Sequence, residues 1–491
     1  MSFPRLCLLL LLVKAVAVCG DDLPVIFLPF VDHHTLNTLV DQIGPNNGET
    51  FPLRYAVVTQ YWDPASGPIF FYCGHELTLE YYINNTVCIP HLFTTPKWQP
   101  PLLSLASYVI VSRRCLLAML VFQNKTLSEL LTTEQALADY VKLLHHIKIK
   151  YPFADKAPII AIGGFYGGML ATYFRLKHPD LITGALASSA PVSMIPGMVP
   201  CHAFDYKLTQ AFRRESAACE GAIRRSWPLL YSRADTKPKA IGFFQSHRVC
   251  PEQVAYGLGF FWEWMRETYI RLAMFNYKEP ARRVTLLPRY PLGEACDILT
   301  EANDDDSLVE AVFKVANMFY NQTGDLACFN ILHYFKDNPV WNFQMCTELV
   351  TTQCSNGDAD MLYVRQWNLK KIRDNCQKLY NVKPQPRKLY AEYGIRFSDS
   401  SNIIFSNGEF DPWTSLGYLS PKTETVIPIL IGESAHQEDL AFRTSVDRHD
   451  LLRAREQERR HVRKWIEEAQ TKEDTTLIVD HEMHKLDRDE F

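Results

Sequence analysis

The sequence lacks the features that define several large classes of protein. It contains no Cys-x-x-Cys pair, no internal repeat and no low-complexity segment, and we predict no metal site and no cofactor. Its formal net charge is only −4 over 491 residues, which gives no electrostatic reason to expect a nucleic acid as partner. With 22% charged and 47% apolar residues, the chain is neither disordered nor collagen-like. We expect one large globular domain with an insertion, or two to three domains.

Long apolar runs are also missing, except at the amino terminus. Arg5 precedes the apolar stretch 6–13, Lys14 interrupts this stretch, and small residues follow up to Gly20. This order is typical of a secretory signal peptide, which we place at residues 1–20. The alternative is a membrane anchor, but eight apolar residues are too few to cross a bilayer. We therefore predict a chain of the secretory pathway with no membrane span.

Cysteine is the residue that stands out. The chain has 13 cysteines, of which two fall in the signal segment and eight lie between Cys201 and Cys376. So many cysteines without a metal motif indicate an oxidising compartment and disulfide bonds. Three Asn-x-Thr triplets, at Asn84, Asn124 and Asn321, are candidate glycosylation sites in such a compartment.

The predicted elements divide the mature chain into parts with different patterns. Residues 21–195 alternate between buried strands and helices, which predicts an α/β fold with a parallel sheet. Residues 196–384 show amphipathic helical patterns and most of the cysteines, so we interpret them as a helical insertion. Residues 385–470 return to strands and end in a charged helix from Asp450 to Ala469.

The remaining residues, 471–491, are polar, and we expect them to form a loose tail. The last four, Arg488-Asp-Glu-Phe491, are loosely similar to a Lys-Asp-Glu-Leu retention signal. Because phenylalanine replaces the final leucine, we favour a solvated end over a retention signal.

Individual elements follow from local patterns. Thr132-Thr-Glu-Gln135 is a capping-box pattern that opens a helix running to about Lys150. A second helix is expected from Gly168 to Lys177. Short apolar runs predict buried strands at 68–73, 159–163, 184–188, 402–405 and 426–431.

A glycine-rich turn connects the strand at 159–163 to the next helix. Its sequence, Gly163-Gly-Phe-Tyr-Gly167, has the frame of a nucleophile elbow, in which the apex side chain is held exposed above the sheet. The glycines allow the sharp turn and the close packing of helix on strand. The apex is normally serine, but here it is Phe165. The frame alone also fits an ordinary strand-to-helix turn.

Two further residues complete a catalytic pattern. Asp411 follows one predicted strand and His436 follows the next. The chain order of nucleophile, acid and histidine is that of α/β-hydrolases. In such a triad the acid orients the histidine, and the histidine accepts the proton of the nucleophile. An Asp-Pro turn and a structural histidine are the alternatives, but their joint occurrence in this order favours the triad.

With these motifs in this order, the sequence resembles the lysosomal prolyl carboxypeptidase and dipeptidyl peptidase II family of serine exopeptidases, with closest agreement to the prolyl carboxypeptidase branch. The similarity covers most of residues 50–470. The matching segments are 132–140, 161–170, 184–191, 327–330, 402–413 and 434–436.

The resemblance implies an α/β-hydrolase with an inserted helical, disulfide-bonded cap domain. It also implies peptide substrates or ligands with proline near an end, and a lysosomal or secreted location. Members commonly dimerise, and nothing in this sequence decides whether this chain forms a homodimer. The implied disulfides are Cys201–Cys354, Cys219–Cys296, Cys250–Cys328 and Cys346–Cys376. Cys73, Cys88 and Cys115 have no assigned pair.

The resemblance assigns roles to further residues. Tyr166, Asp360 and Trp413 correspond to substrate-binding positions, with Asp360 at the aspartate that meets the substrate amine in dipeptidyl peptidases. Gly74, His75 and Tyr166 correspond to the oxyanion region.

Several positions depart from the family pattern. Phe165 replaces the nucleophilic serine, and a phenyl ring cannot form an acyl-enzyme. The family's Gly-Asn-Glu-Gly loop reads Gly74-His-Glu-Leu77, and its pair of histidines reads His436-Gln437. Ser188 and Ser189 follow the next strand without an elbow, so we do not favour either as a replacement nucleophile.

Two interpretations remain open. In the first, the chain is a secretory homologue of proline-specific exopeptidases that is catalytically impaired. In the second, it is an active serine exopeptidase whose recorded sequence or mechanism hides the nucleophile, since a single base change converts serine to phenylalanine. Several independent changes around one pocket favour the first interpretation.

Overall fold

The computed structural model describes most of the chain between residues 32 and 489. The described ranges are 32–44, 48–58, 67–74, 103–107, 130–151, 156–250, 253, 258–278, 287–331, 339–394, 397–421, 423–441 and 443–489. At 103–107, 258, 339–340 and 472–489 it describes the backbone alone. The predicted signal peptide, His75, Asn84, Asn124, Cys88 and Cys115 lie outside the described residues.

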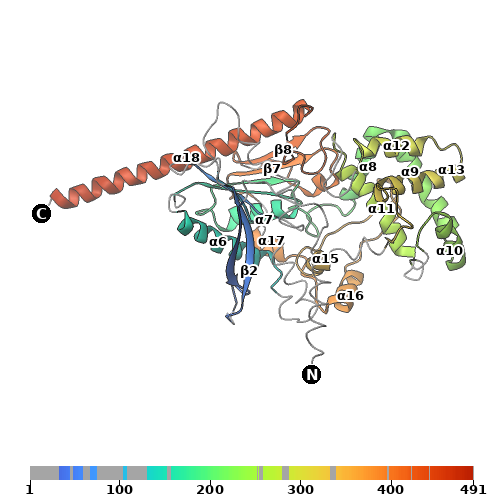
Figure 1. The fold of residues 1–491 in the computed structure, drawn as a ribbon, viewed down its shortest axis with the longest axis horizontal. Coiled ribbons are helices and arrows are strands. Elements are labelled where there is room, and N and C mark those ends of the chain that lie inside the picture. The colour runs from blue at the N-terminus through green and yellow to red at the C-terminus, as the bar shows by residue number, and fades with distance from the viewer. Residues whose placement is uncertain are drawn as a thin grey trace, which may run out of the picture.

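A sheet of eight strands forms the centre of the described structure (Figure 1). The strands are β1 Asp32–Leu39, β2 Thr50–Val58, β3 Ile69–Tyr72, β4 Leu103–Ser107, β5 Ile159–Gly164, β6 Gly184–Ser188, β7 Ile403–Gly408 and β8 Val426–Ile431. Their order in the sheet is β1-β2-β4-β3-β5-β6-β7-β8. The strands from β4 to β8 pair in parallel, as predicted. At the other edge, β2 pairs antiparallel with both β1 and β4, which the sequence patterns did not indicate.

Different helices cover the two faces of the sheet. Successive residues of a strand point to opposite faces, so neighbours along one strand pack in different cores. Phe71 of β3 packs in a core with helices α6 (Thr133–Lys150) and α7 (Tyr166–Lys177). Its neighbours Phe70 and Tyr72 pack in a second core with Trp465 of helix α18 (His449–Asp489). The central strands are buried on both faces, which explains why they appear in the sequence as continuous apolar runs.

The helix ends agree with some predictions and differ from others. The hydroxyl of Thr132 accepts a hydrogen bond from the Gln135 N–H and caps α6, as the capping-box pattern predicts. Helix α7 begins at Tyr166, before the predicted start at Gly168. Helix α18 continues to Asp489, so the tail expected to be loose is helical, and Figure 1 shows this helix projecting from the body.

A long helical segment separates β6 from β7, although these two strands are hydrogen-bonded neighbours. Its helices are α8 Ala203–Glu215, α9 Ala217–Arg233, α10 Lys237–Ser246, α11 Leu258–Met274, α12 Pro291–Thr300, α13 Asp305–Tyr320, α15 Pro339–Met345, α16 Leu369–Tyr380 and α17 Lys388–Tyr393. Figure 1 shows α8 to α13 gathered at one end of the molecule. The α/β fold with an inserted helical segment is confirmed, and the boundaries at 196 and 384 stay predictions.

Four disulfides tie this segment together. They are Cys201–Cys354, Cys219–Cys296, Cys250–Cys328 and Cys346–Cys376, the pairs implied by the family resemblance. Cys73 is a free, buried cysteine at the end of β3. In the described part of the chain, no helix combines the length and the apolar composition that a membrane crossing requires.

The turn after β5 yields a prediction for stability. A Cβ atom at Gly163 would lie 2.2 Å from the carbonyl oxygen of Gly167, so we expect Gly163→Ala to lower the free energy of unfolding by about 1–3 kcal/mol. Gly242, inside α10, has open space around a Cβ, and Gly242→Ala should raise stability by up to about 1 kcal/mol. Urea unfolding of both variants checks this, and equal effects would contradict the proposed crowding.

Candidate active site

The predicted triad positions meet at one edge of the sheet. Phe165 follows β5, Asp411 follows β7 and His436 follows β8. Because these strands are parallel, their carboxyl ends open onto the same edge, where ligands of open α/β sheets bind. The structure therefore brings together three positions that are far apart in the sequence.

The backbone at Phe165 has the strained geometry of an elbow. Its φ of 51° and ψ of −119° are rare for a residue with a side chain and cost on the order of 1–3 kcal/mol. The Phe165 N–H donates a 2.9 Å hydrogen bond to the carbonyl of Ser188 on the neighbouring strand. The chain thus holds the apex conformation of a nucleophile elbow although the residue there is phenylalanine.

Asp411 and His436 form a buried pair. Asp411 Oδ2 lies 2.7 Å from His436 Nδ1, and the side chains are 0% and 7% exposed, respectively. The other oxygen, Oδ1, accepts the Trp413 N–H at 3.1 Å and caps the short 3-10 helix η3 (Pro412–Leu416). Asp411 therefore both caps the Asp-Pro turn and pairs with His436.

The main chain of His436 is held from the helical insertion. Its N–H donates to the carbonyl of Met274 at 3.1 Å, and its carbonyl accepts from the Tyr277 hydroxyl at 2.6 Å. These bonds fix the loop, so the ring is oriented both through Asp411 and through its own backbone.

The ring of Phe165 fills the space in front of His436. Its centroid lies 4.6 Å from that of Trp413 and 5.5 Å from those of Trp341 and His436. The residue is only 6% exposed. A phenyl ring has no oxygen, nitrogen or sulfur atom, so the apex supplies no nucleophile to the acid and histidine beside it.

Gln437 is the residue whose role the sequence did not predict. Its side-chain nitrogen lies 3.0 Å from His436 Nε2, the ring atom that accepts a proton in a working triad. The sequence identified this position only as a departure from the family's pair of histidines. The backbone of Gln437 has a positive φ of 56°, which is uncommon for a residue other than glycine.

Neither nearby serine takes the place of the nucleophile. The Ser188 hydroxyl donates to Asp439 at 2.6 Å. The Ser189 hydroxyl oxygen accepts the backbone N–H of Gln437 at 3.0 Å. Both hydroxyls are engaged in holding the loop that follows His436.

The residues assigned by resemblance have different surroundings. Tyr166 is fully buried, and its hydroxyl accepts from the Gln344 amide at 3.0 Å. Gly74, two residues after the end of β3, adopts a positive φ of 54°. Trp413 is half-buried against Phe165.

Asp360 is turned into its own loop. Its carboxylate accepts hydrogen bonds from the N–H groups of Asn356 and Leu362, at 3.0 and 3.1 Å, and from the Ser355 hydroxyl. The residue is 0% exposed. In the described structure its hydrogen bonds therefore stabilise this loop, and its part in binding a substrate amine stays a prediction.

Asn321, the described glycosylation candidate, ends helix α13. Its side-chain oxygen accepts the Leu326 N–H at 2.9 Å, and its side-chain nitrogen donates to Asn317 at 3.0 Å. Both ends of its amide group are thus used within the protein, and its glycosylation stays a prediction.

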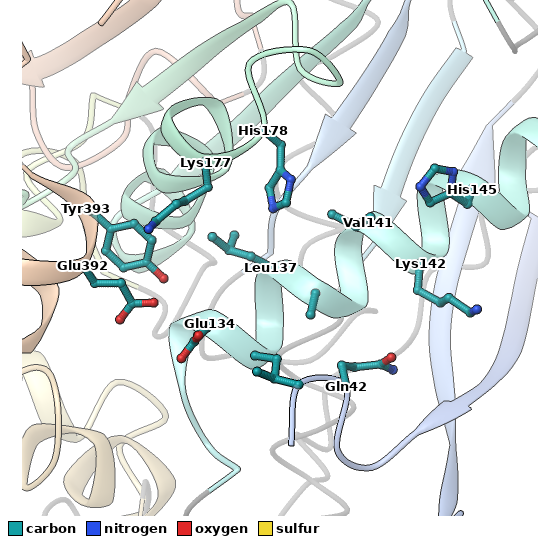
Figure 2. A pocket seen from close by; sticks show the side chains of 12 residues that line it. Gln42, Glu134, Leu137, Val141, Lys142, His145, Lys177, His178, Glu392 and Tyr393 are labelled. Atoms are coloured by element: carbon teal, nitrogen blue, oxygen red, sulfur yellow. The ribbon is translucent and has the colours of Figure 1, made fainter. Parts of the chain in front are cut away.

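A separate hollow of about 400 Å³ lies away from the triad positions. Figure 2 shows the side chains that line it, which come from α6, the end of α7, α17 and the turn after β1. Glu134 and Glu392 lie at one side, and Lys142 and His145 lie further along α6. The hollow contains none of the residues that the sequence assigned to the site.

Helix α18 holds the loop that follows His436 through hydrogen bonds. Arg455 donates to the carbonyls of Glu438 and Asp439, at 2.9 and 3.0 Å. Glu458, one turn further, accepts from the Ser406 hydroxyl of β7. Burial, and then the nearby charge of Asp439, raise the pKa of Glu458 to about 8. Helix α18, which the sequence predicted only as a charged helix, thus contains a buried carboxyl group that is hydrogen-bonded to β7, the strand that precedes Asp411.

The sheet order, the elbow after β5, the acid after β7 and the histidine after β8 define the chain as an α/β-hydrolase with a helical cap. Residues 38–458 match the family described as serine carboxypeptidase S28, and the chain belongs to this family. This confirms the resemblance found in the sequence.

Relatives in the same family are similar over most of their length. The chain is 34% identical to the lysosomal Pro-X carboxypeptidase of Homo sapiens over 432 residues, which are 87% of this chain and 86% of the relative. It is 35% identical to that of Pongo abelii over 437 residues, with coverages of 87% and 86%. Among solved structures, the peroxisomal α/β-hydrolase Lpx1 of Saccharomyces cerevisiae aligns with 94% of this chain and 97% of its own at 10% identity and a TM-score of 0.36.

The raised pKa of Glu458 predicts how stability depends on pH. Between its ordinary value of 4.5 and about 8, the carboxyl group is protonated in the folded chain and ionised in the unfolded chain. The folded state then binds more protons, so the contribution of Glu458 is complete below pH 4.5 and is lost as the pH rises towards 8. We expect the stability of wild type relative to Glu458→Gln to fall across this window by up to about 1.4 kcal/mol per pH unit.

Thermal or urea unfolding at several pH values measures this difference. Glu456→Gln is the control, because Glu456 lies on the same helix but its side chain is 68% exposed. A curve for Glu458→Gln parallel to that of wild type, like the control, would contradict the prediction.

Proposed function

We propose that this chain is a catalytically impaired member of the serine carboxypeptidase S28 family that binds peptides with proline near an end without cleaving them. The observation that carries the proposal is the phenyl ring at the elbow apex, 5.5 Å from the ring of His436. Loss of the nucleophile leaves only the small rate acceleration that binding and the oxyanion site supply.

The alternative is an active exopeptidase that cleaves next to proline. The intact pair of Asp411 and His436, 2.7 Å apart, favours it, because nothing in the acid and base has been lost. It requires a nucleophile from elsewhere, and the hydroxyls of Ser188 and Ser189 are committed to other partners. We therefore place it second.

Aromatic side chains support a peptide ligand. Trp341 and Trp413 are half-buried and flank Phe165. Flat aromatic surfaces bind proline rings well, because proline is rigid and loses little entropy on binding. The relatives are named Pro-X carboxypeptidases, and this name also points to proline in the ligand.

The cellular location is part of the proposal. The predicted signal peptide, the four disulfides and the lysosomal relatives support a place in the secretory pathway, in the lysosome or outside the cell. A domain division at residues 196 and 384 and a signal peptide over residues 1–20 complete the proposed organisation.

Reaction with a fluorophosphonate probe tests the loss of catalysis. We expect no labelling of the wild-type protein, because the probe reacts with an activated serine and the apex has none. An active serine carboxypeptidase of the same family serves as positive control. Strong labelling that disappears in His436→Ala would contradict the proposal and favour the alternative.

Isothermal titration calorimetry tests the proposed ligand. A short peptide with proline next to its end should bind without turnover, and Trp413→Ala should weaken binding at least about tenfold by removing an aromatic anchor. Trp262→Ala is the matched control, because Trp262 is a half-buried tryptophan of α11 that packs on Phe261 and Tyr231. Absence of binding to wild type would contradict the proposed ligand and would indicate that the Phe165 ring blocks the site.

A further inference from the structure

The side chain of Gln437 is confined beside the elbow. The residue is 4% exposed, and its backbone N–H is held by the Ser189 hydroxyl. A Cβ atom at Gly164 would lie 2.4 Å from the amide oxygen of Gln437, so the amide rests against the backbone one residue before the apex. The amide group therefore lies between the elbow and the ring of His436.

The contact with His436 sets the direction of the hydrogen bonds. An amide NH₂ only donates, so His436 Nε2 accepts from Gln437 at 3.0 Å through the lone pair of the ring. The ring proton is then on Nδ1, which faces Asp411 Oδ2 at 2.7 Å. This is the tautomer that a general base needs, but the lone pair that would take the proton is already used.

We infer that Gln437 is a positioning residue that occupies the base atom of His436, so that the site is disabled at the base as well as at the nucleophile. The inference rests on the proposed function and deepens it. A serine introduced at position 165 would need the same lone pair to activate its hydroxyl. It would therefore compete with the Gln437 amide for His436.

Nuclear magnetic resonance of the protein with ¹⁵N-labelled histidine tests the contact without any need for catalysis. In Gln437→Leu, the Nε2 signal of His436 should move towards that of a ring nitrogen with a free lone pair, while the Nδ1 signal keeps its position. The signal is assigned through its loss in His436→Gln. Gln135→Leu is the control, since Gln135 is a buried glutamine of α6 and its side-chain nitrogen donates to Asp41 in the turn after β1. An unchanged Nε2 signal in Gln437→Leu overturns the inference.

Variants that carry Phe165→Ser test the consequence for reactivity. We expect Phe165→Ser combined with Gln437→Leu to react with a fluorophosphonate about tenfold faster, or more, than Phe165→Ser alone. Restoring the family's second histidine with Gln437→His should also accelerate it, and adding Gln135→Leu should not. Equal rates for the single and the combined variant, zero included, contradict the inference, and thermal unfolding of each variant confirms that it is folded.

The pH profile separates this role from a purely structural one. If Gln437 competes for the lone pair, Gln437→Leu should change the reaction rate most at pH values where the His436 ring is neutral, and least where the ring is protonated. A uniform change at every pH contradicts the inference. Labelling of the wild type that depends on His436 would instead overturn the proposed function, so the two failures are distinguishable.

Discussion

The sharp turn between β5 and α7 is the constraint on which the site depends. Phe165 adopts a φ of 51°, and Gly163, two residues earlier, has no room for a side chain. Such strain persists only where the surrounding structure enforces it, here through the close packing of α7 on β5 and β6. The turn therefore keeps its shape with any apex residue that tolerates the conformation. This is why the architecture of a hydrolase survives although the nucleophile is absent.

The acid and the histidine are preserved by interactions that do not involve the nucleophile. Asp411 caps η3, and His436 is held by Met274, Tyr277 and the loop that α18 supports. Substitution of the apex leaves these bonds untouched, so an intact Asp-His pair is weak evidence of activity. The Gln437 amide donates to His436 Nε2, which would otherwise be a buried, unpaired acceptor.

Much of the fold could be predicted from local patterns, and the site could be predicted in part. Strands β6 and β8 have the expected bounds because their apolar runs are bordered by turn residues. The antiparallel pairing of β2 was missed because the pattern of a strand does not record which neighbours it pairs with, although the first half of β2 alternates between exposed and buried residues. The length of α18 was missed because its polar end has no core partner in the sequence pattern. The role of Gln437 depends on its backbone conformation and on packing against Gly164, which no motif records.

The central claim is that the folded site has no working nucleophile. Steady-state hydrolysis of a peptide with proline next to its end, by wild type and by His436→Ala between pH 4.5 and 7.5, tests this claim most directly. The account predicts that both proteins release product at the same rate, close to that of the peptide in buffer. A wild-type rate well above the rate in buffer at any pH in this range, reduced to the buffer rate in His436→Ala, would contradict it.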